Sequence, residues 1–229
     1  MKNIIITGAA GNLGKTVTQY LLDEGYNIEA TLGSHDSEDF IVHDKLSSQH
    51  LNLLDEDKVE EYVKEVHAKH DTIDAAVLLV GGFMPGGFKQ TTKKDLERMY
   101  KLNFETAFFL VKPLLEIFEK QAEGGKFIFI GTRPALNPKE GKNLIAYSLS
   151  KTLLFRLAEI VNAYGEDKQI QASVIVPSTM DTPGTRSAMP DADFEKWVPT
   201  KNVAETIAFL LSETGGMLRD TIVKIYNRS

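Results

Sequence analysis

A tyrosine and a lysine four positions apart, Tyr147 and Lys151, are well suited to proton transfer. In a helix, residues four positions apart lie on one face, about one turn from each other. The spacing of Leu144, Leu154 and Ala158 around them predicts such a helix. An ammonium beside a phenol favours the phenolate, so we expect Lys151 to lower the pKa of Tyr147. Tyr147 could then act as a general acid towards a carbonyl or imine. A surface Tyr–Lys pair is the alternative interpretation.

A glycine-rich turn lies near the start of the chain, between a predicted strand at residues 4–6 and a predicted helix that ends at Gly25. Its sequence, over residues 7–14, is Thr-Gly-Ala-Ala-Gly-Asn-Leu-Gly. Such glycines allow a tight turn and let backbone N–H groups approach a pyrophosphate at the helix N-terminus. A plain tight turn is the alternative, but the position after the first strand favours dinucleotide binding. The candidate cofactor-binding residues are Gly8, Gly11, Asn12, Leu13 and Gly14.

The end of the second predicted strand, residues 27–32, bears on the choice of dinucleotide. An acidic residue there usually receives the ribose 2′-hydroxyl, but this chain continues with Gly33-Ser34-His35. The small corner could admit a 2′-phosphate, although no arginine is present to bind it. Asp36 or Asp39 could still reach the same place. We therefore slightly favour NADP(H) over NAD(H). The candidate cofactor-binding residues in this part of the chain are Ser34 and Asn52.

Two further polar residues stand in apolar surroundings. Thr132 follows the predicted strand at 126–130, where its hydroxyl could hydrogen-bond a substrate carbonyl or imine. An ordinary strand-end cap is an equally good interpretation of Thr132. Asn103 stands within an apolar helical segment and needs hydrogen-bond partners. It either bends the helix and holds water near the lysine, or is a satisfied core asparagine.

Strands alternate with helices along the whole chain, which predicts an α/β fold with a doubly wound parallel sheet of about seven strands and helices on both faces. We expect one Rossmann-type domain over residues 1–229, with a lid at about 178–199. Pro113 is expected to kink or interrupt a helical stretch at 93–119. The least defined element is the third strand, assigned to 40–42 together with 50–53. The remaining strands are expected at 75–80, 170–176 and 221–226, and the other helices at 55–69, 144–163 and 201–212, the last capped at Thr200.

The composition is that of an ordinary globular protein, with 42% hydrophobic and 25% charged residues. A net charge of −6 with no long basic run argues against nucleic acid and membrane surfaces as partners. The chain has no cysteine, and its five histidines lack metal-ligand spacing, so we expect no metal. With no signal peptide evident and no apolar stretch of membrane-spanning length, we expect a cytoplasmic protein.

Together, the glycine turn, the helical asparagine, the hydroxyl after the fifth strand and Tyr-x-x-x-Lys resemble the short-chain dehydrogenase/reductases. The resemblance covers nearly the whole chain. It implies a catalytic tetrad of Asn103, Thr132, Tyr147 and Lys151, the last two also binding cofactor. It also implies a homodimer or homotetramer. Further cofactor-binding residues implied by it are Gly81, Gly82, Pro177 and Thr182.

Within that family the chain resembles the dihydropteridine reductase branch. The similarity lies in Gly81-Gly82 after an apolar strand and in the lid sequence from Met180 to Pro199. Two features differ from that branch. It usually lacks the tetrad's asparagine and hydroxyl residue, and it carries an acidic residue where this chain has Gly33.

These observations predict an NAD(P)H-dependent reductase that transfers a hydride to a carbonyl or conjugated imine of a small-molecule substrate. Quinonoid dihydropterin is the leading substrate, through resemblance alone. A ketone or 3-oxoacyl thioester is the alternative, which the complete tetrad favours. A non-catalytic redox sensor that binds dinucleotide is a hypothesis of another class, although a sensor has no need of a proton donor.

Overall fold

One parallel sheet organises the chain in the computed structural model, which describes residues 2–37 and 40–228. The sheet has seven strands in the order β3-β2-β1-β4-β5-β6-β9, all parallel. Their bounds are β1 Asn3–Thr7, β2 Asn27–Leu32, β3 Leu46–His50, β4 Ala75–Leu78, β5 Gly125–Ile130, β6 Ile170–Pro177 and β9 Ile222–Ile225. The direction of winding reverses at β1, between β2 and β4, and ligands of such sheets bind at the carboxyl ends of the strands there. The predicted fold class is confirmed.

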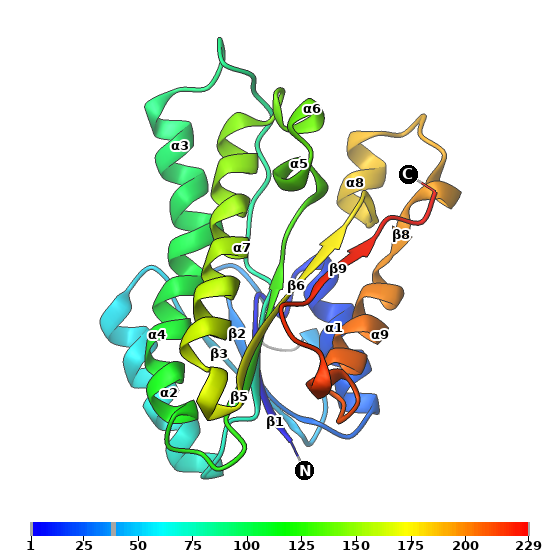
Figure 1. Cartoon of the computed structure of the whole chain (residues 1–229). Coiled ribbons are helices and arrows are strands. Elements are labelled where there is room, and N and C mark those ends of the chain that lie inside the picture. Colours follow the sequence, from blue (N-terminus) through cyan, green and yellow to red (C-terminus); the bar gives the residue numbers. More distant parts are fainter. Residues whose placement is uncertain (1, 38–39, 229) are drawn as a thin grey trace.

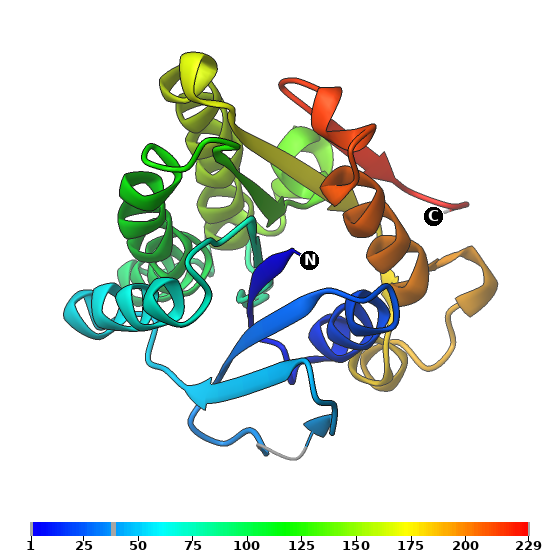
Figure 2. The same ribbon diagram turned by 90° about the horizontal axis from the view of Figure 1, so that it is seen from below.

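Helices cover both faces of the sheet and enclose two apolar cores. On one face lie α2 (Glu56–His70), α4 (Thr106–Phe118) and α7 (Ile145–Tyr164), and on the other α1 (Asn12–Asp23) and α9 (Thr200–Leu211) (Figure 1). Figure 2 shows the same layers from below, with the strands between the two groups of helices. The central strand β1 is fully buried, as its run Ile4–Ile6 of β-branched residues requires.

The position predicted for the third strand is wrong. It is β3, Leu46–His50, beside β2, and not the segments 40–42 and 50–53. Its sequence, Leu-Ser-Ser-Gln-His, has one apolar residue, because an edge strand has only partly buried faces. A search for apolar runs therefore passes over it.

The helical stretch predicted at 93–119 departs from regular α-helix at the asparagine and not at the proline. The helix α3 (Lys93–Tyr100) continues through a π-helical turn, Lys101–Glu105, into α4. Pro113 lies inside α4 and interrupts nothing. The π-turn adds one residue per turn and is common at functional sites, and here it contains Asn103.

The segment predicted as a lid has structure of its own. It contains β7 (Met180–Asp181) paired with β8 (Val198–Pro199), the helix α8 (Pro183–Ala188) and a 3₁₀ turn at Phe194–Lys196. The Asn227 amide, near the C-terminus, donates to the carbonyls of Glu195 and Trp197 at 3.0 and 2.7 Å. The short helices α5 (Arg133–Leu136) and α6 (Pro138–Gly141) lie at the same end of the sheet.

Helix ends follow local capping chemistry. The Asp55 side chain accepts from the Lys58 N–H and begins α2 at the predicted place. The predicted cap at Thr200 is wrong. Thr200 is the first residue of α9, its hydroxyl pairs with that of Thr16 at 3.0 Å, and Pro199 is the N-cap.

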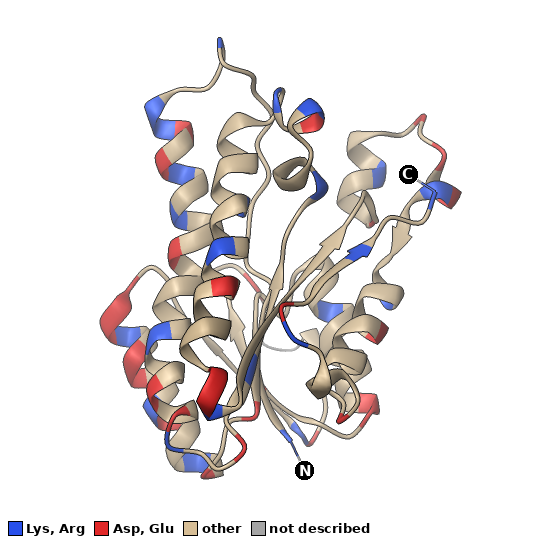
Figure 3. Ribbon diagram, in the orientation of Figure 1, with Lys and Arg blue, Asp and Glu red and all other residues tan. Residues whose placement is uncertain are grey.

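The described surface carries both signs of charge, and Figure 3 shows Lys/Arg and Asp/Glu interspersed along α2 and α3. Among the described residues, no helix is long and apolar enough to cross a membrane, and no group of acidic or histidine side chains is arranged to hold a metal ion.

Candidate active site

The predicted proton-transfer pair lies in the first half of α7, beside the carboxyl end of β5. Lys151 is 6% exposed, and its ammonium donates to the carbonyl of Ile130, the last residue of β5, at 2.9 Å. Burial lowers the pKa of Lys151 to about 8. The lysine is therefore anchored to the sheet edge and loses its charge within reach of physiological pH.

The predicted lowering of the Tyr147 pKa by Lys151 is wrong for this structure. Burial raises the pKa of Tyr147, and the Thr132 hydroxyl, which hydrogen-bonds the phenol, offsets part of that rise. The lysine instead satisfies the Ile130 carbonyl, and the tyrosine ring packs edge-on against Phe83 with centroids 5.1 Å apart. Tyr147 is thus held as the neutral phenol, which is the form that can donate a proton.

Thr132 lies two residues beyond the end of β5 and is 7% exposed. It occupies the N-cap position of α5, yet its side chain makes no capping hydrogen bond. The hydroxyl thus hydrogen-bonds Tyr147 and does not cap the helix. This geometry favours the substrate-facing interpretation of Thr132 over the strand-end cap.

Asn103 is satisfied by protein groups on two sides. Its Oδ1 accepts from the Gly82 N–H at 2.8 Å, and its Nδ2 donates to the Gly82 carbonyl at 3.2 Å and to Ser150 Oγ at 2.9 Å. A Cβ on Gly81 would lie 2.7 Å from Asn103 Oδ1 and 3.0 Å from Lys151 Nζ. Asn103 is thus a core asparagine whose amide is fully hydrogen-bonded, and it lies in the π-turn of the helix. Gly81 lies between this amide and the Lys151 ammonium.

The glycine turn forms a cradle at the N-terminus of α1. Gly8 has φ +65° and packs against Val80, and a Cβ on Gly14 would lie 2.1 Å from the Gly8 carbonyl oxygen, so these positions need glycine. The helix has no side-chain cap and no acidic residue in its first turn. Its free N–H groups and positive dipole end suit a pyrophosphate, so the residues present fit a dinucleotide.

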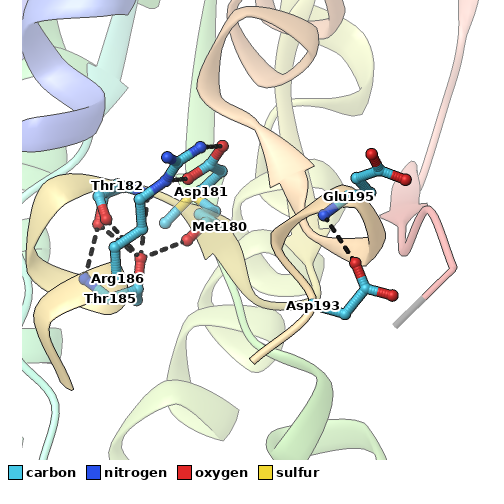
Figure 4. Close-up of polar contacts among 7 residues, drawn as sticks. All are labelled: Met180, Asp181, Thr182, Thr185, Arg186, Asp193 and Glu195. Atoms are coloured by element: carbon cyan, nitrogen blue, oxygen red, sulfur yellow. Dashed lines mark hydrogen bonds and ion pairs between the residues drawn. The ribbon is translucent and has the colours of Figure 1, made fainter. Parts of the chain in front are cut away.

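The segment predicted as a lid meets this turn. A Cβ on Gly184 would lie 3.5 Å from Asn12 Nδ2, so α8 begins beside the start of α1. Thr182, 7% exposed, caps α8 by accepting from the Thr185 N–H at 3.2 Å (Figure 4). Pro177 ends β6 and is buried.

An ion pair joins two residues at the start of this segment, Asp181 and Arg186. Arg186 donates to both carboxylate oxygens of Asp181, at 2.6 and 2.7 Å, and lowers the pKa of that carboxyl (Figure 4). Its guanidinium also lies 4.6 Å from the centre of the Phe194 ring. Asp193, at the start of the following turn, accepts from the Glu195 N–H at 3.2 Å.

The corner after β2 does hold a carboxylate, supplied from four residues beyond the strand. Asp36 Oδ2 accepts from the Gly33 N–H at 2.8 Å, while His50 Nδ1 lies 2.7 Å from the Gly33 carbonyl. Ser34 is exposed at this corner. Asp39 lies outside the described residues. Asn52 is exposed beyond β3, and its side chain accepts from the Leu54 N–H at 3.2 Å.

Two residues of the site were missed by sequence reasoning. Phe83, 63% exposed, touches the tyrosine ring, and its position after two glycines is the signal that could have identified it. Ser150 bonds Asn103, and its signal was its place inside Tyr-x-x-x-Lys, directly before the lysine. Both contacts join segments that are distant in sequence, and the spacing of residues within one segment cannot predict such contacts.

The fold and this edge of the sheet define a nucleotide-binding oxidoreductase, and the family comparison agrees. The short chain dehydrogenase family model matches residues 2–193, so the chain belongs to the short-chain dehydrogenase/reductase family. It is accordingly an NAD(P)-dependent oxidoreductase that acts on a small-molecule substrate.

Individual relatives share about a quarter of their residues with this chain or fewer. Dihydropteridine reductase of Dictyostelium discoideum is 26% identical over 90% of this chain and 86% of that protein. The 3-oxoacyl-acyl-carrier-protein reductase FabG of Buchnera aphidicola is 24% identical over 91% of this chain and 88% of its own length. A structure of ElxO with NADP bound superimposes with a TM-score of 0.89 at 22% identity, covering 98% and 96% of the two chains, a likeness of fold.

Proposed function

We propose that this chain reduces a carbonyl or conjugated imine at the expense of NAD(P)H, with Tyr147 as the proton donor. The observation that carries the proposal is the half-buried phenol of Tyr147, whose raised pKa keeps it neutral, paired with the Thr132 hydroxyl and one helical turn from Lys151. The reduced dinucleotide, with its pyrophosphate held at the glycine turn, would supply a hydride from its nicotinamide ring to the substrate carbon. The phenol gives its proton to the substrate oxygen or nitrogen, so the double bond gains one hydride and one proton.

The other residues prepare this transfer. Thr132 hydrogen-bonds the reacting heteroatom and fixes its distance from the phenol. Lys151, cationic below pH about 8, stabilises the phenolate as the proton leaves and binds the nicotinamide ribose. Asn103 holds the Gly81-Gly82 segment against the lysine. Thr182 and Pro177 border the cofactor from the lid side, and the lid at 178–199 closes over one dinucleotide-binding domain of 229 residues.

For the substrate we propose a quinonoid dihydropterin. The 26% identity with a dihydropteridine reductase over 90% of the chain supports it. A ketone or 3-oxoacyl thioester is the second candidate, because Thr132 and Asn103 complete a tetrad and a FabG reductase is 24% identical.

For the cofactor we propose NADP(H), because β2 ends without a carboxylate of its own and the related ElxO fold binds NADP. Asp36, on the Gly33 N–H, is the group at this corner that opposes a 2′-phosphate. The cofactor-binding set is completed by Ser34 and Asn52, both exposed on this side of the sheet.

We also propose assembly into a homodimer or homotetramer through α7 and the continuous helical stretch from α3 to α4. Aromatic rings from α3, the π-turn and α4 form a half-exposed ladder on this stretch, Tyr100 with Phe104 at 5.3 Å and Phe104 with Phe108 at 5.8 Å between centroids. Leu149 and Ile160 of α7 are each 57% exposed.

The test is to follow NAD(P)H absorbance with quinonoid dihydropterin and with an acetoacetyl thioester, each cofactor being titrated separately. We expect oxidation of NADPH that depends on dihydropterin. Turnover of the thioester alone would select the second candidate, and tight cofactor binding without turnover of either substrate would contradict the proposal.

A further inference from the structure

Ser150 lies within the Tyr147–Lys151 motif, directly before the lysine, and its hydroxyl bonds Asn103 and a backbone carbonyl. It is 4% exposed on α7, and its Oγ accepts from Asn103 Nδ2 at 2.9 Å. The same Oγ donates to the backbone carbonyl of Tyr147 at 2.9 Å. Both halves of the hydroxyl are therefore used, one towards the π-turn and one towards the backbone of the catalytic tyrosine.

These bonds form a continuous chain from the loop after β4 to α7. The Gly82 N–H donates to Asn103 Oδ1, Asn103 Nδ2 donates to Ser150, and Ser150 donates to Tyr147. Asn103 is 1% exposed, so a lost partner is not replaced freely by solvent. A buried chain with each group satisfied fixes the relative position of its two ends.

The series of hydrogen bonds ends at the Gly81-Gly82 loop, and this loop borders Lys151. A Cβ on Gly81 would lie within 3.0 Å of both Asn103 Oδ1 and Lys151 Nζ, so loop, amide and ammonium are already in contact. Rotation of the Asn103 amide would move Gly81-Gly82 relative to the lysine. The orientation of that amide depends on Ser150, because Oγ takes the shorter of the two oxygen contacts of Nδ2.

We propose that Ser150 is a positioning residue, which holds the Asn103 amide and through it the Gly81-Gly82 segment in register with Tyr147 and Lys151. The kinetic part of this inference rests on the proposed reductase function, and the structural part does not.

Ser148, two residues before Ser150 in the sequence, provides a matched control. Ser148 is on the same helix, is 8% exposed, and its Oγ has no hydrogen-bond partner among the residues that the structure describes. Ser148→Ala and Ser150→Ala therefore remove the same buried group from positions two residues apart on α7, but only the second breaks the series of hydrogen bonds.

Kinetics and hydrogen exchange test the proposal together. Ser150→Ala should lower kcat about tenfold with KM for NADPH within about twofold, because misplacement of reacting groups acts on the chemical step. Peptides spanning residues 80–86 should exchange faster in Ser150→Ala than in Ser148→Ala, since the acceptor of the Gly82 N–H is loosened. The pair Asn103→Ala and Ser150→Ala should be non-additive, the double variant being no slower than Asn103→Ala.

The proposal is overturned if Ser150→Ala equals Ser148→Ala in kcat or in exchange, or if the double variant multiplies the two losses. Should Ser150→Ala fail to fold, Ser150→Cys takes its place, because its sulfur is only a weak acceptor for Asn103 Nδ2 and exchange should still be faster; wild-type exchange in it would overturn the proposal. If the wild type turns over neither a carbonyl nor an imine, the proposed function fails, while the exchange comparison still decides the role of Ser150.

Discussion

At the scale of single residues, Lys151 and Tyr147 lie one helical turn apart, and burial shifts the pKa of each towards its neutral form. For the phenol this keeps the proton in place until the substrate develops negative charge. For the lysine it places the loss of charge near pH 8, because the sheet edge gives the ammonium one carbonyl and little water. The two side chains therefore set an upper pH limit on reduction, with the lysine titrating first.

The pH profile follows from that order. Below about pH 8 Lys151 is protonated and can stabilise the phenolate, and above it the charge is lost while Tyr147 is still a phenol. We predict that kcat/KM for the substrate falls as pH rises through about 8, because kcat/KM reports groups of the enzyme before the substrate binds. The measurement is a profile from pH 6 to 10 at saturating NADPH. A rate independent of pH up to 9.5 would contradict the assignment.

Asp36 governs the cofactor preference in this account. Its carboxylate accepts from the Gly33 N–H, at the corner where we propose that the 2′-phosphate binds. Asp36→Asn keeps the size and removes the charge, so the ratio of NADPH to NADH affinity should rise about threefold, the worth of an exposed charge contact. Fluorescence titration of both cofactors measures it, with Asp44→Asn, an exposed acid on the following loop, as control. An unchanged ratio in Asp36→Asn would exclude Asp36 from the ribose site.

At the scale of elements, the glycine turn and the π-turn bring the two halves of the site together. The first sets a helix N-terminus free of side-chain caps, and the second turns Asn103 towards the loop after β4. Both depend on close approach: Gly14 against the Gly8 carbonyl, and Gly81 against Asn103.

Gly14→Ala tests the turn. Its Cβ would overlap a backbone oxygen at 2.1 Å, so the turn must move. We predict a loss of about 1–3 kcal/mol in the free energy of unfolding and at least about a tenfold rise in the Kd for NADPH. Gly11→Ala is the graded control for stability, since its Cβ would meet one oxygen at 3.2 Å and its φ is −69°. Equal melting temperatures for the two variants would refute this packing argument.

At the scale of the whole molecule, the sheet was predictable because its central strands are buried on both faces and read as apolar runs, as Ile4–Ile6 do. The edge strand β3 was not, since its polar sequence lacks that signal. Among site residues, Tyr147 and Lys151 were found through helical spacing. The position of Asp36 was left open, because its contact with Gly33 depends on how the chain turns back after β2.

The same limit applies to electrostatics. The helical spacing of four residues predicted the lysine beside the phenol. In the folded protein its ammonium instead donates to the carbonyl of Ile130, 21 residues earlier at the end of β5. The direction of both pKa shifts therefore follows from packing at the sheet edge, which no local pattern encodes.

The most direct test of the central claim, that the Tyr147 phenol donates the proton, is single-site removal of its hydroxyl. Turnover with NADPH should be compared in wild type, Tyr147→Phe and Tyr164→Phe, the last removing an exposed phenol from the far end of the same helix. We predict that Tyr147→Phe loses about 10²–10⁴-fold in kcat while its Kd for NADPH stays within about threefold, and that Tyr164→Phe matches wild type. A Tyr147→Phe variant that keeps more than about one-tenth of wild-type kcat would contradict the account.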